Sequence, residues 1–327
     1  MKQNDTLTAQ EQTISADIIA RMKKYLAKKY KGQEMKRFFH PKMHGLVKAE
    51  FRVDASLPAE YHVGIFKPGT VYQAFIRFSN AKRTVTKDIK RDFRGFAVKL
   101  FPENMESGLP IFQDFILASD TTFEVRNVKV LQRSIKALTG NIFDKLGFAM
   151  FHMGSIMKSM RDTKKCSNLL EIQYWSQTPY RFGNKAVKYS VKPSEPGNTP
   201  FPANPSDNFL REQLVKDLSE KDFYFDFLVQ FYTDAKTTPL DDTKVAWTTP
   251  FHKIATIHIP KQIFDTPDQR KLGEDLSFAP WHNQISHEPM GSIDLIRKAV
   301  YKALAEFRHE QNEVTAQEVA EEKERVG

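Results

Sequence analysis

Short runs of alternating or continuous apolar residues, each bounded by turn residues, recur from residue 47 to residue 260 and predict β-strands. The runs lie at 47–53, 71–78, 94–101, 110–117, 169–176, 185–191, 222–232 and 253–260. Many short strands in succession are typical of an antiparallel barrel. We therefore predict an α+β protein with an antiparallel β-barrel core and with inserted and C-terminal helices.

Helical spacing of apolar residues marks three other stretches, at 10–32, 127–163 and 292–308, and the last follows Gly291 and consists of good helix formers. A loop rich in Pro, Asn and Ser separates two of the strands at 192–208. The tail at 311–327 is rich in Glu and predicts a solvated, fraying helix.

Composition agrees with one folded unit. The 327 residues are 40% hydrophobic and 12% aromatic, enough for a large core in a single domain. Cys166 is the only cysteine, which excludes an intramolecular disulfide and a thiolate metal cluster and favours a reducing compartment. The polar start of the chain lacks the apolar core of a signal peptide, and no 18-residue apolar run occurs, so we expect a soluble cytoplasmic protein.

The net charge of +9 raises the question of a polyanionic partner. The densest basic run consists of Lys23, Lys24, Lys28, Lys29, Lys31, Lys36 and Arg37. No nucleic-acid motif accompanies it, so we interpret it as a solvated helix face and expect no nucleic-acid partner.

A second basic region surrounds a segment rich in Met and Phe at 142–160. This segment could make a transient contact with a membrane surface or an acyl chain. Ordinary core packing is the alternative that we favour, because methionine is a common gap-filler in cores.

Candidate chemistry begins with Arg297, Tyr301 and Arg308 in the predicted C-terminal helix. Their spacings of four and seven residues place all three on roughly one side. A free phenol has a pKa of about 10, so it becomes an anionic ligand at neutral pH only where a metal and a nearby cation favour the phenolate. Ferric haem with a tyrosinate ligand meets that need. The alternative is an aromatic residue packed under a surface cation.

Several segments in order support the first interpretation. They are Arg37-Phe-Phe-His40, Ala74-Phe-Ile-Arg77-Phe-Ser79, Arg91-Asp-Phe-Arg-Gly-Phe-Ala-Val-Lys-Leu100, Asp114-Phe-Ile-Leu117 and Leu276-Ser-Phe-Ala-Pro280. In order and residue type they resemble the haem-pocket segments of the catalase family, over about residues 35 to 310. The stretches 171–183, 280–282 and 287–291 resemble the short catalase-related branch that includes coral allene oxide synthases.

The resemblance implies a helical arm at 1–34, a catalase-like haem-binding domain at 35–310 and a charged tail at 311–327. Haem, with haem b expected, would lie between the barrel and the C-terminal helix.

The resemblance also assigns roles on the two sides of the haem. Tyr301 would bind the iron, with Arg297 stabilising its phenolate. Arg37, Arg77 and Arg308 would face the propionates, since arginine pairs with carboxylates through two charge-assisted hydrogen bonds.

On the opposite side of the haem, His40 would be the catalytic base, and Ser79 would hydrogen-bond to its ring. An unperturbed histidine pKa of about 6.5 suits the movement of a proton between two peroxide oxygens.

The substrate channel implied by the resemblance contains Phe39, Asp92, Ala118, Ser119 and Phe123. Ala118 and Ser119 stand where catalases carry an Asn-Asn doublet; alanine offers no hydrogen bond and serine is shorter. Phe39 replaces a small β-branched residue, and it either lines a pocket for an apolar hydroperoxide or fills core space.

Three functions from different classes follow. The first is a haem enzyme acting on organic hydroperoxides, such as fatty-acid hydroperoxides, as an oxidoreductase or a hydroperoxide dehydratase. The second is a minimal catalase or peroxidase acting on hydrogen peroxide. The third is a haem-binding or sensing protein without turnover. The resemblance also leaves a homo-oligomer open.

Overall fold

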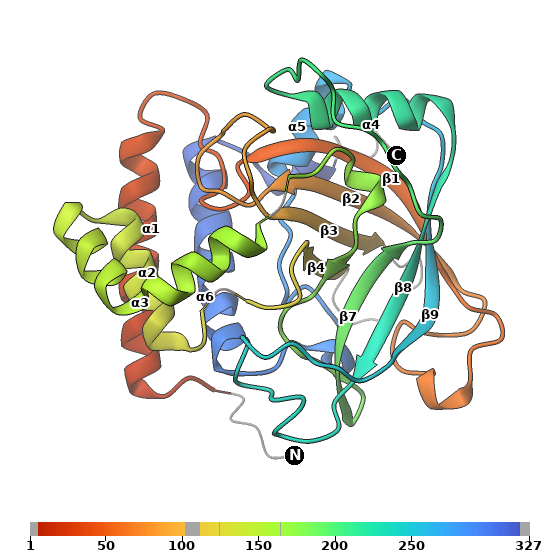
Figure 1. Cartoon of the computed structure of the whole chain (residues 1–327), viewed down its shortest axis with the longest axis horizontal. Coiled ribbons are helices and arrows are strands. Elements are labelled where there is room, and N and C mark those ends of the chain that lie inside the picture. The colour runs from red at the N-terminus through yellow and green to blue at the C-terminus, as the bar shows by residue number, and fades with distance from the viewer. Residues whose placement is uncertain (1–5, 102–111, 124, 164, 321–327) are drawn as a thin grey trace.

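The computed structural model of the chain describes residues 6–101, 112–123, 125–163 and 165–320. Its centre is a closed antiparallel β-barrel (Figure 1). The strands are β1 (Lys42–Val53), β2 (Val71–Asn80), β3 (Arg94–Phe101), β4 (Gln113–Ala118), β5 (Tyr174–Trp175), β6 (Tyr180–Phe182), β7 (Lys185–Pro193), β8 (Phe223–Phe231) and β9 (Phe251–Ile259). They follow the order β5-β4-β3-β2-β1-β9-β8-β7, and β5 pairs with β7 to close the ring, while β6 extends β7 outside it.

Aromatic rings fill the inside of the barrel. Phe51, Phe115 and Phe227 are at most 1% exposed, and the centroids of the last two rings lie 4.8 Å apart. Tyr189 joins them, with its ring centroid 5.0 Å from that of Phe115. A barrel of eight strands is just wide enough for side chains to fill its interior. The filled interior has no space for a ligand, so a ligand would bind on the outer face of the sheet.

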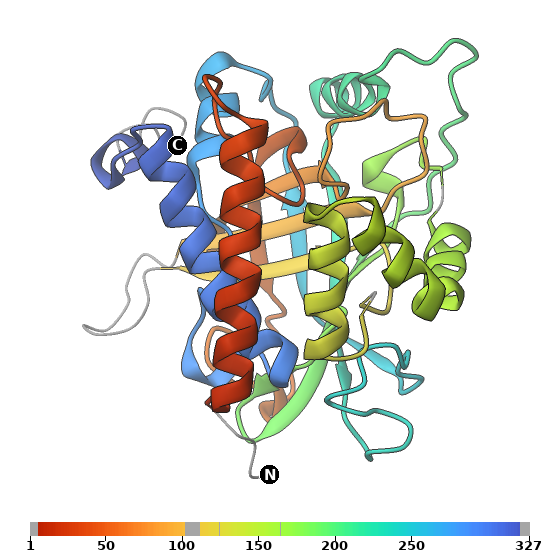
Figure 2. The ribbon, with the colours of Figure 1, turned by 90° about the vertical axis from the view of Figure 1, so that its left-hand side faces the viewer.

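Helices lie outside the barrel, on more than one side of it (Figure 1). They are α1 (Ala9–Lys29), α2 (Val128–Thr139), α3 (Ile142–Asp162), α4 (Phe209–Glu220), α5 (Pro267–Asp275) and α6 (Ser292–Gln311). Helix α1 starts at a capping box between Thr8 and Glu11, and it shares an apolar cluster with α2 and α6. The two views show α6 between α1 and the barrel (Figures 1 and 2).

The predicted α+β barrel is confirmed, and most predicted strands agree with the observed ones within a few residues. The strand expected at 169–176 is wrong, because a 3₁₀ turn at Leu169–Glu171 precedes a β5 of only two residues. The predicted strand at 110–117 begins outside the described residues; its described part corresponds to β4.

Three further elements were not predicted: β6, α4 and α5. The stretch of helical spacing at 127–163 contains two helices, α2 and α3, which are divided at Gly140. In the tail, residues 316–320 are helical, but a break at 312–315 separates them from α6. No helix in the described ranges is long and apolar enough to span a membrane.

Candidate active site

The outer face of β2, β3 and β4 carries the first part of the site. Strand register aligns two cross-strand rows, Ser79–Gly95–Ala118 and Arg77–Ala97–Ile116. The intervening Phe78 and Phe96 point into the barrel core, because successive strand residues face opposite sides. The outer face is therefore built mainly from small side chains, and Ala97, Ile116 and Ala118 remain partly exposed.

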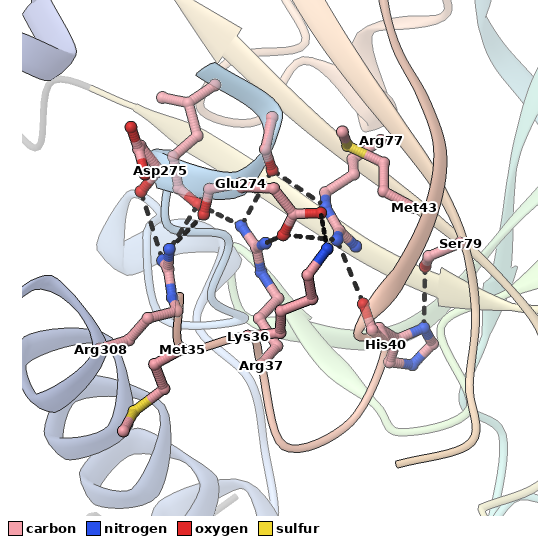
Figure 3. A network of polar contacts seen from close by, with 12 residues as sticks. Met35, Lys36, Arg37, His40, Met43, Arg77, Ser79, Glu274, Asp275 and Arg308 are labelled. Carbon is pink, nitrogen blue, oxygen red and sulfur yellow. Dashed lines mark hydrogen bonds and ion pairs between the residues drawn. The ribbon is translucent and has the colours of Figure 1, made fainter. Parts of the chain in front are cut away.

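His40 lies against this face. Its Nδ1 is 2.9 Å from the hydroxyl oxygen of Ser79 (Figure 3). A Cβ atom on Gly95 would lie 2.6 Å from His40 Nδ1 and 2.6 Å from Ser79 Oγ. Both distances are far shorter than van der Waals contact, so only glycine at position 95 allows the two side chains to meet.

The backbone of His40 is itself strained. Its φ of 59° lies in the left-handed region, which non-glycine residues seldom adopt. Arg77 Nη2 donates to the His40 carbonyl over 3.1 Å, and the His40 amide donates to the Ala81 carbonyl over 3.3 Å. Strain of this kind persists where the surroundings hold it, and it is common at functional sites.

The electrostatic surroundings keep the imidazole neutral. Burial lowers the pKa of His40 to about 3, and the positive charges of Arg77 and Arg37 contribute to the shift. At neutral pH one ring nitrogen therefore keeps a free lone pair, which can accept a hydrogen bond from a ligand. Because Ser79 engages Nδ1, the ring presents Nε2 to a ligand.

Arg37, Arg77 and Arg308 converge from three separate segments on the C-terminal end of α5 (Figure 3). Arg37 Nη2 and Arg77 Nε donate to the Gly273 carbonyl over 3.2 and 3.1 Å, and Arg308 Nη2 donates to the Asp275 carbonyl over 3.2 Å. The last carbonyls of a helix lack intrahelical partners and carry partial negative charge, which attracts cations.

One carboxylate, that of Glu274, contacts this arginine cluster from the same helix end. It lies 3.0 Å from Arg37 Nη1 and 3.7 Å from Arg77 Nη2. Burial by itself raises the pKa of Glu274, but Arg77 and Arg37 lower it below its usual value, so the side chain is ionised at neutral pH.

Positive charge exceeds negative charge in this arginine cluster. Burial lowers the pKa of Arg308 to about 9, and Arg37 contributes by repulsion, although Glu274 opposes the shift. Burial also lowers the pKa of Arg37 and of Arg77. Burial and mutual repulsion destabilise the charged form of these guanidinium groups, so the binding of further carboxylates beside them is favourable.

On α6, the Arg297 guanidinium links Tyr301 to a buried carboxylate. Its Nη2 donates to the Tyr301 hydroxyl oxygen over 3.2 Å, and its Nη1 donates to Asp294 over 2.7 Å and to the Thr178 hydroxyl over 3.2 Å. Burial by itself lowers the pKa of Arg297, but Tyr301 and Asp294 raise it above its ordinary value. Arg297 is thus a permanent cation beside the phenol.

Of the two residues at the expected asparagine positions, only Ala118 lies in the row beside Gly95 and Ser79. The Ser119 hydroxyl accepts the Arg94 amide over 2.9 Å, so it is committed to the backbone. Neither side chain supplies the hydrogen bond that an amide would make near the imidazole.

The other predicted channel residues are more widely spread. The ring centroid of Phe123 lies 5.5 Å from the Arg297 guanidinium. Asp92 is buried and accepts the Lys82 amide over 3.2 Å, and burial raises its pKa. Phe39 is 40% exposed and therefore does not fill core space.

Sequence reasoning did not single out Gly95, Glu274, Asp294 or Thr178. A signal existed for Asp294, because it precedes Arg297 by three residues on a predicted helix. Gly95, Glu274 and Thr178 acquire their roles from segments distant in sequence, and composition alone carries no sign of them.

No family model matches the sequence, and no curated protein does either. The three-dimensional structure, however, is similar to solved structures. A fungal catalase matches with a TM-score of 0.65 and 16% identity over 90% of this chain and 64% of that one. The chain has the catalase fold. A bacterial catalase matches with a TM-score of 0.66 and 17% identity over 86% of this chain and 59% of that one.

The chain thus spans about three fifths of the length of the catalases it resembles. At 16–17% identity the similarity concerns the fold, and any activity of this chain depends on its own residues.

Proposed function

We propose that the protein is a haem-dependent enzyme acting on peroxides. The observation that carries the proposal is the position of Arg77, which belongs to two groups at once. Its Nη2 donates to the His40 carbonyl over 3.1 Å, and its Nε binds the end of α5 beside Glu274 over 3.1 Å. Groups suited to hold carboxylates and a group suited to move a proton therefore adjoin each other.

The residues present fit a haem. Three arginines face a single glutamate, which leaves positive charge for two propionates. The small side chains of the outer sheet face would lie against a flat ring, and the half-buried Tyr301, with the Arg297 guanidinium beside it, would offer its oxygen to the iron. Haem bound here would supply the iron that activates the O–O bond of a peroxide.

The protein groups would manage charge and protons. His40 Nε2 would take a proton from one peroxide oxygen and return it to the other, while Ser79 fixes the orientation of the ring. Asp294 and Thr178 would orient Arg297, which in turn stabilises the Tyr301 phenolate.

Organic hydroperoxides, such as those of fatty acids, are the substrate class that we favour, as in our first interpretation of the sequence. Ala118 offers no hydrogen bond to orient hydrogen peroxide beside the imidazole, and Ser119 is committed to the Arg94 backbone. The His40–Ser79 contact equally supports the second candidate, a minimal catalase or peroxidase acting on hydrogen peroxide.

The decisive experiment compares two substrates in one haem-loaded preparation. Oxygen release from hydrogen peroxide is measured beside consumption of a fatty-acid hydroperoxide. Rapid loss of the hydroperoxide with little oxygen release supports the proposal. Rapid oxygen release would instead indicate a minimal catalase. No turnover of either substrate would indicate a haem-binding protein. The Ala118→Asn variant should raise oxygen release at unchanged haem content, because it adds an amide beside Gly95.

A further inference from the structure

Helix α3 exposes an unusual amount of apolar surface. It packs against α2 and lies at the margin of the molecule, away from the barrel (Figures 1 and 2). Its large exposed side chains are Ile142 at 58%, Phe143 at 77%, Leu146 at 59%, Met150 at 71%, Phe151 at 74%, Met153 at 51% and Met157 at 63%. Core packing, which we favoured from sequence, is therefore wrong for these residues.

The exposed side chains form a stripe. Phe143, Leu146 and Met150 follow one another at intervals of three and four residues, which places them on one side of the part of α3 before His152. Met153 and Met157 are four residues apart and lie on one side of the part after it. The opposite side carries half-buried rings: Phe148 and His152 stack with centroids 4.5 Å apart. The helix bends at His152, so the stripe spans two helical segments.

Positive charge surrounds the stripe. Residues 128–165 contain eight basic residues and two acidic ones, so this segment carries +6 of the chain's formal +9. The exposed members include Arg133, Lys136, Lys145, Arg161 and Lys165. Asp144 is paired with Lys136 over 3.3 Å, and the excess of six positive charges already counts this acidic residue.

The charge decides between two occupants of this apolar face. A two-fold contact between copies of the chain would place the same patch on both sides and bring like charges together. An anionic lipid surface would instead meet the cations with opposite charge, and its acyl boundary would take up the apolar stripe.

We propose that α3, with the basic residues around it, docks on the headgroup layer of a bilayer that contains anionic phospholipid. The phenylalanine, leucine and methionine side chains enter the acyl boundary, and the lysine and arginine side chains contact the headgroups. The proposal needs no haem and stands apart from the peroxide chemistry.

The test uses the full-length protein without added haem. Its sedimentation with phosphatidylcholine vesicles is compared with that with vesicles containing about 30% phosphatidylserine, a composition that gives the bilayer a negative surface potential. We expect binding that grows with phosphatidylserine and falls as salt is raised. The double variant Phe143→Glu, Met150→Glu should weaken binding by about a hundredfold, since it removes two large apolar side chains from the stripe.

Ile263→Glu is the matched control, because Ile263 is 86% exposed and lies outside α3. It should bind as the wild type does, and thermal melts should show that all three proteins fold alike. Equal binding to neutral vesicles, or equal loss in both variants, would overturn the proposal. The proposal would also be overturned if the wild type formed a dimer, the double variant stayed monomeric, and neither protein bound vesicles.

Discussion

Gly95→Ala is the smallest change that separates the His40–Ser79 pair. The added methyl group would lie 2.6 Å from Nδ1 of the imidazole and 2.6 Å from the serine hydroxyl oxygen. Position 95 is held in the middle of the sheet by pairing on both sides, with Ser79 and with Ala118. The side chains of His40 and Ser79 therefore have to move, and their hydrogen bond is lost.

The magnitude follows from two known costs. Overpacking by one methyl group costs about 1–3 kcal/mol, and the lost hydrogen bond, about 0.5–1.5 kcal/mol, is part of the same disturbance. We expect the free energy of unfolding to fall by about 1–3 kcal/mol. Peroxide turnover should fall by about 10²–10⁴-fold, the usual contribution of a positioned base.

Three measurements test this prediction: urea unfolding of the protein without haem, titration of the protein with haem, and peroxide turnover of the haem-loaded protein. Gly147→Ala is the control, because its Cβ would meet nothing within 4 Å. We expect Gly95→Ala to bind haem through the arginine cluster. We also expect His40→Ala to turn over no faster than the double variant Gly95→Ala, His40→Ala. Wild-type turnover and stability in Gly95→Ala would refute the reasoning.

Three further predictions concern other parts of the site and fold. Tyr301→Phe should fold and lose the ferric tyrosinate absorbance, and an unchanged haem spectrum would remove Tyr301 as the ligand. Glu274→Gln should raise haem affinity by roughly tenfold or more, because a charge-assisted pair worth about 1.5–3 kcal/mol no longer competes with the propionates. Asp275→Asn should have a smaller effect, because that carboxylate pairs with Lys271 and acts on Arg37 and Arg308 without an ion pair to either. Weaker haem binding in Glu274→Gln would contradict the idea. Burial lowers the pKa of His44 and of His287 to about 4, below the unfolded value of about 6.5. As the pH falls from 6.5 to 4, the unfolded chain therefore binds more protons at these histidines than the folded chain does. Each histidine should lower the free energy of unfolding by roughly 2 kcal/mol between pH 7 and pH 5. Urea unfolding at the two pH values measures this, and equal stability at both would disprove it.

The fold was predicted best where the apolar pattern is strong and local. The strands β2, β3 and β9 lie close to the predicted runs, since alternation over a few residues is visible without knowledge of the partner strand. Helix α4 follows a proline-rich loop and buries Phe209, Leu210, Leu214 and Leu218, a helical spacing that sequence reasoning overlooked. The short β5 was misjudged because its boundary depends on pairing with β4 and β7.

The sequence by itself determined the pairing of Arg297 with Tyr301. Residues four apart on a helix are neighbours whatever surrounds the helix, and the two side chains lie 3.2 Å apart. The sequence likewise determined the small side chain of Ala118 and the excess of positive charge.

Only the tertiary structure decided which distant residues meet. His40 and Ser79 are 39 positions apart, and their contact depends on the register between β2 and β3, which places Gly95 beneath them. Register also decides that Ala118, and not Ser119, lies in the row with Gly95 and Ser79, since a shift of one residue turns every side chain of a strand to the opposite face. The apolar stripe of α3 is likewise visible in the sequence, but only the packing of α3 against α2 shows that the stripe faces outward. Contacts within a turn of helix are fixed by local geometry, whereas contacts between strands and between layers depend on how the whole chain closes.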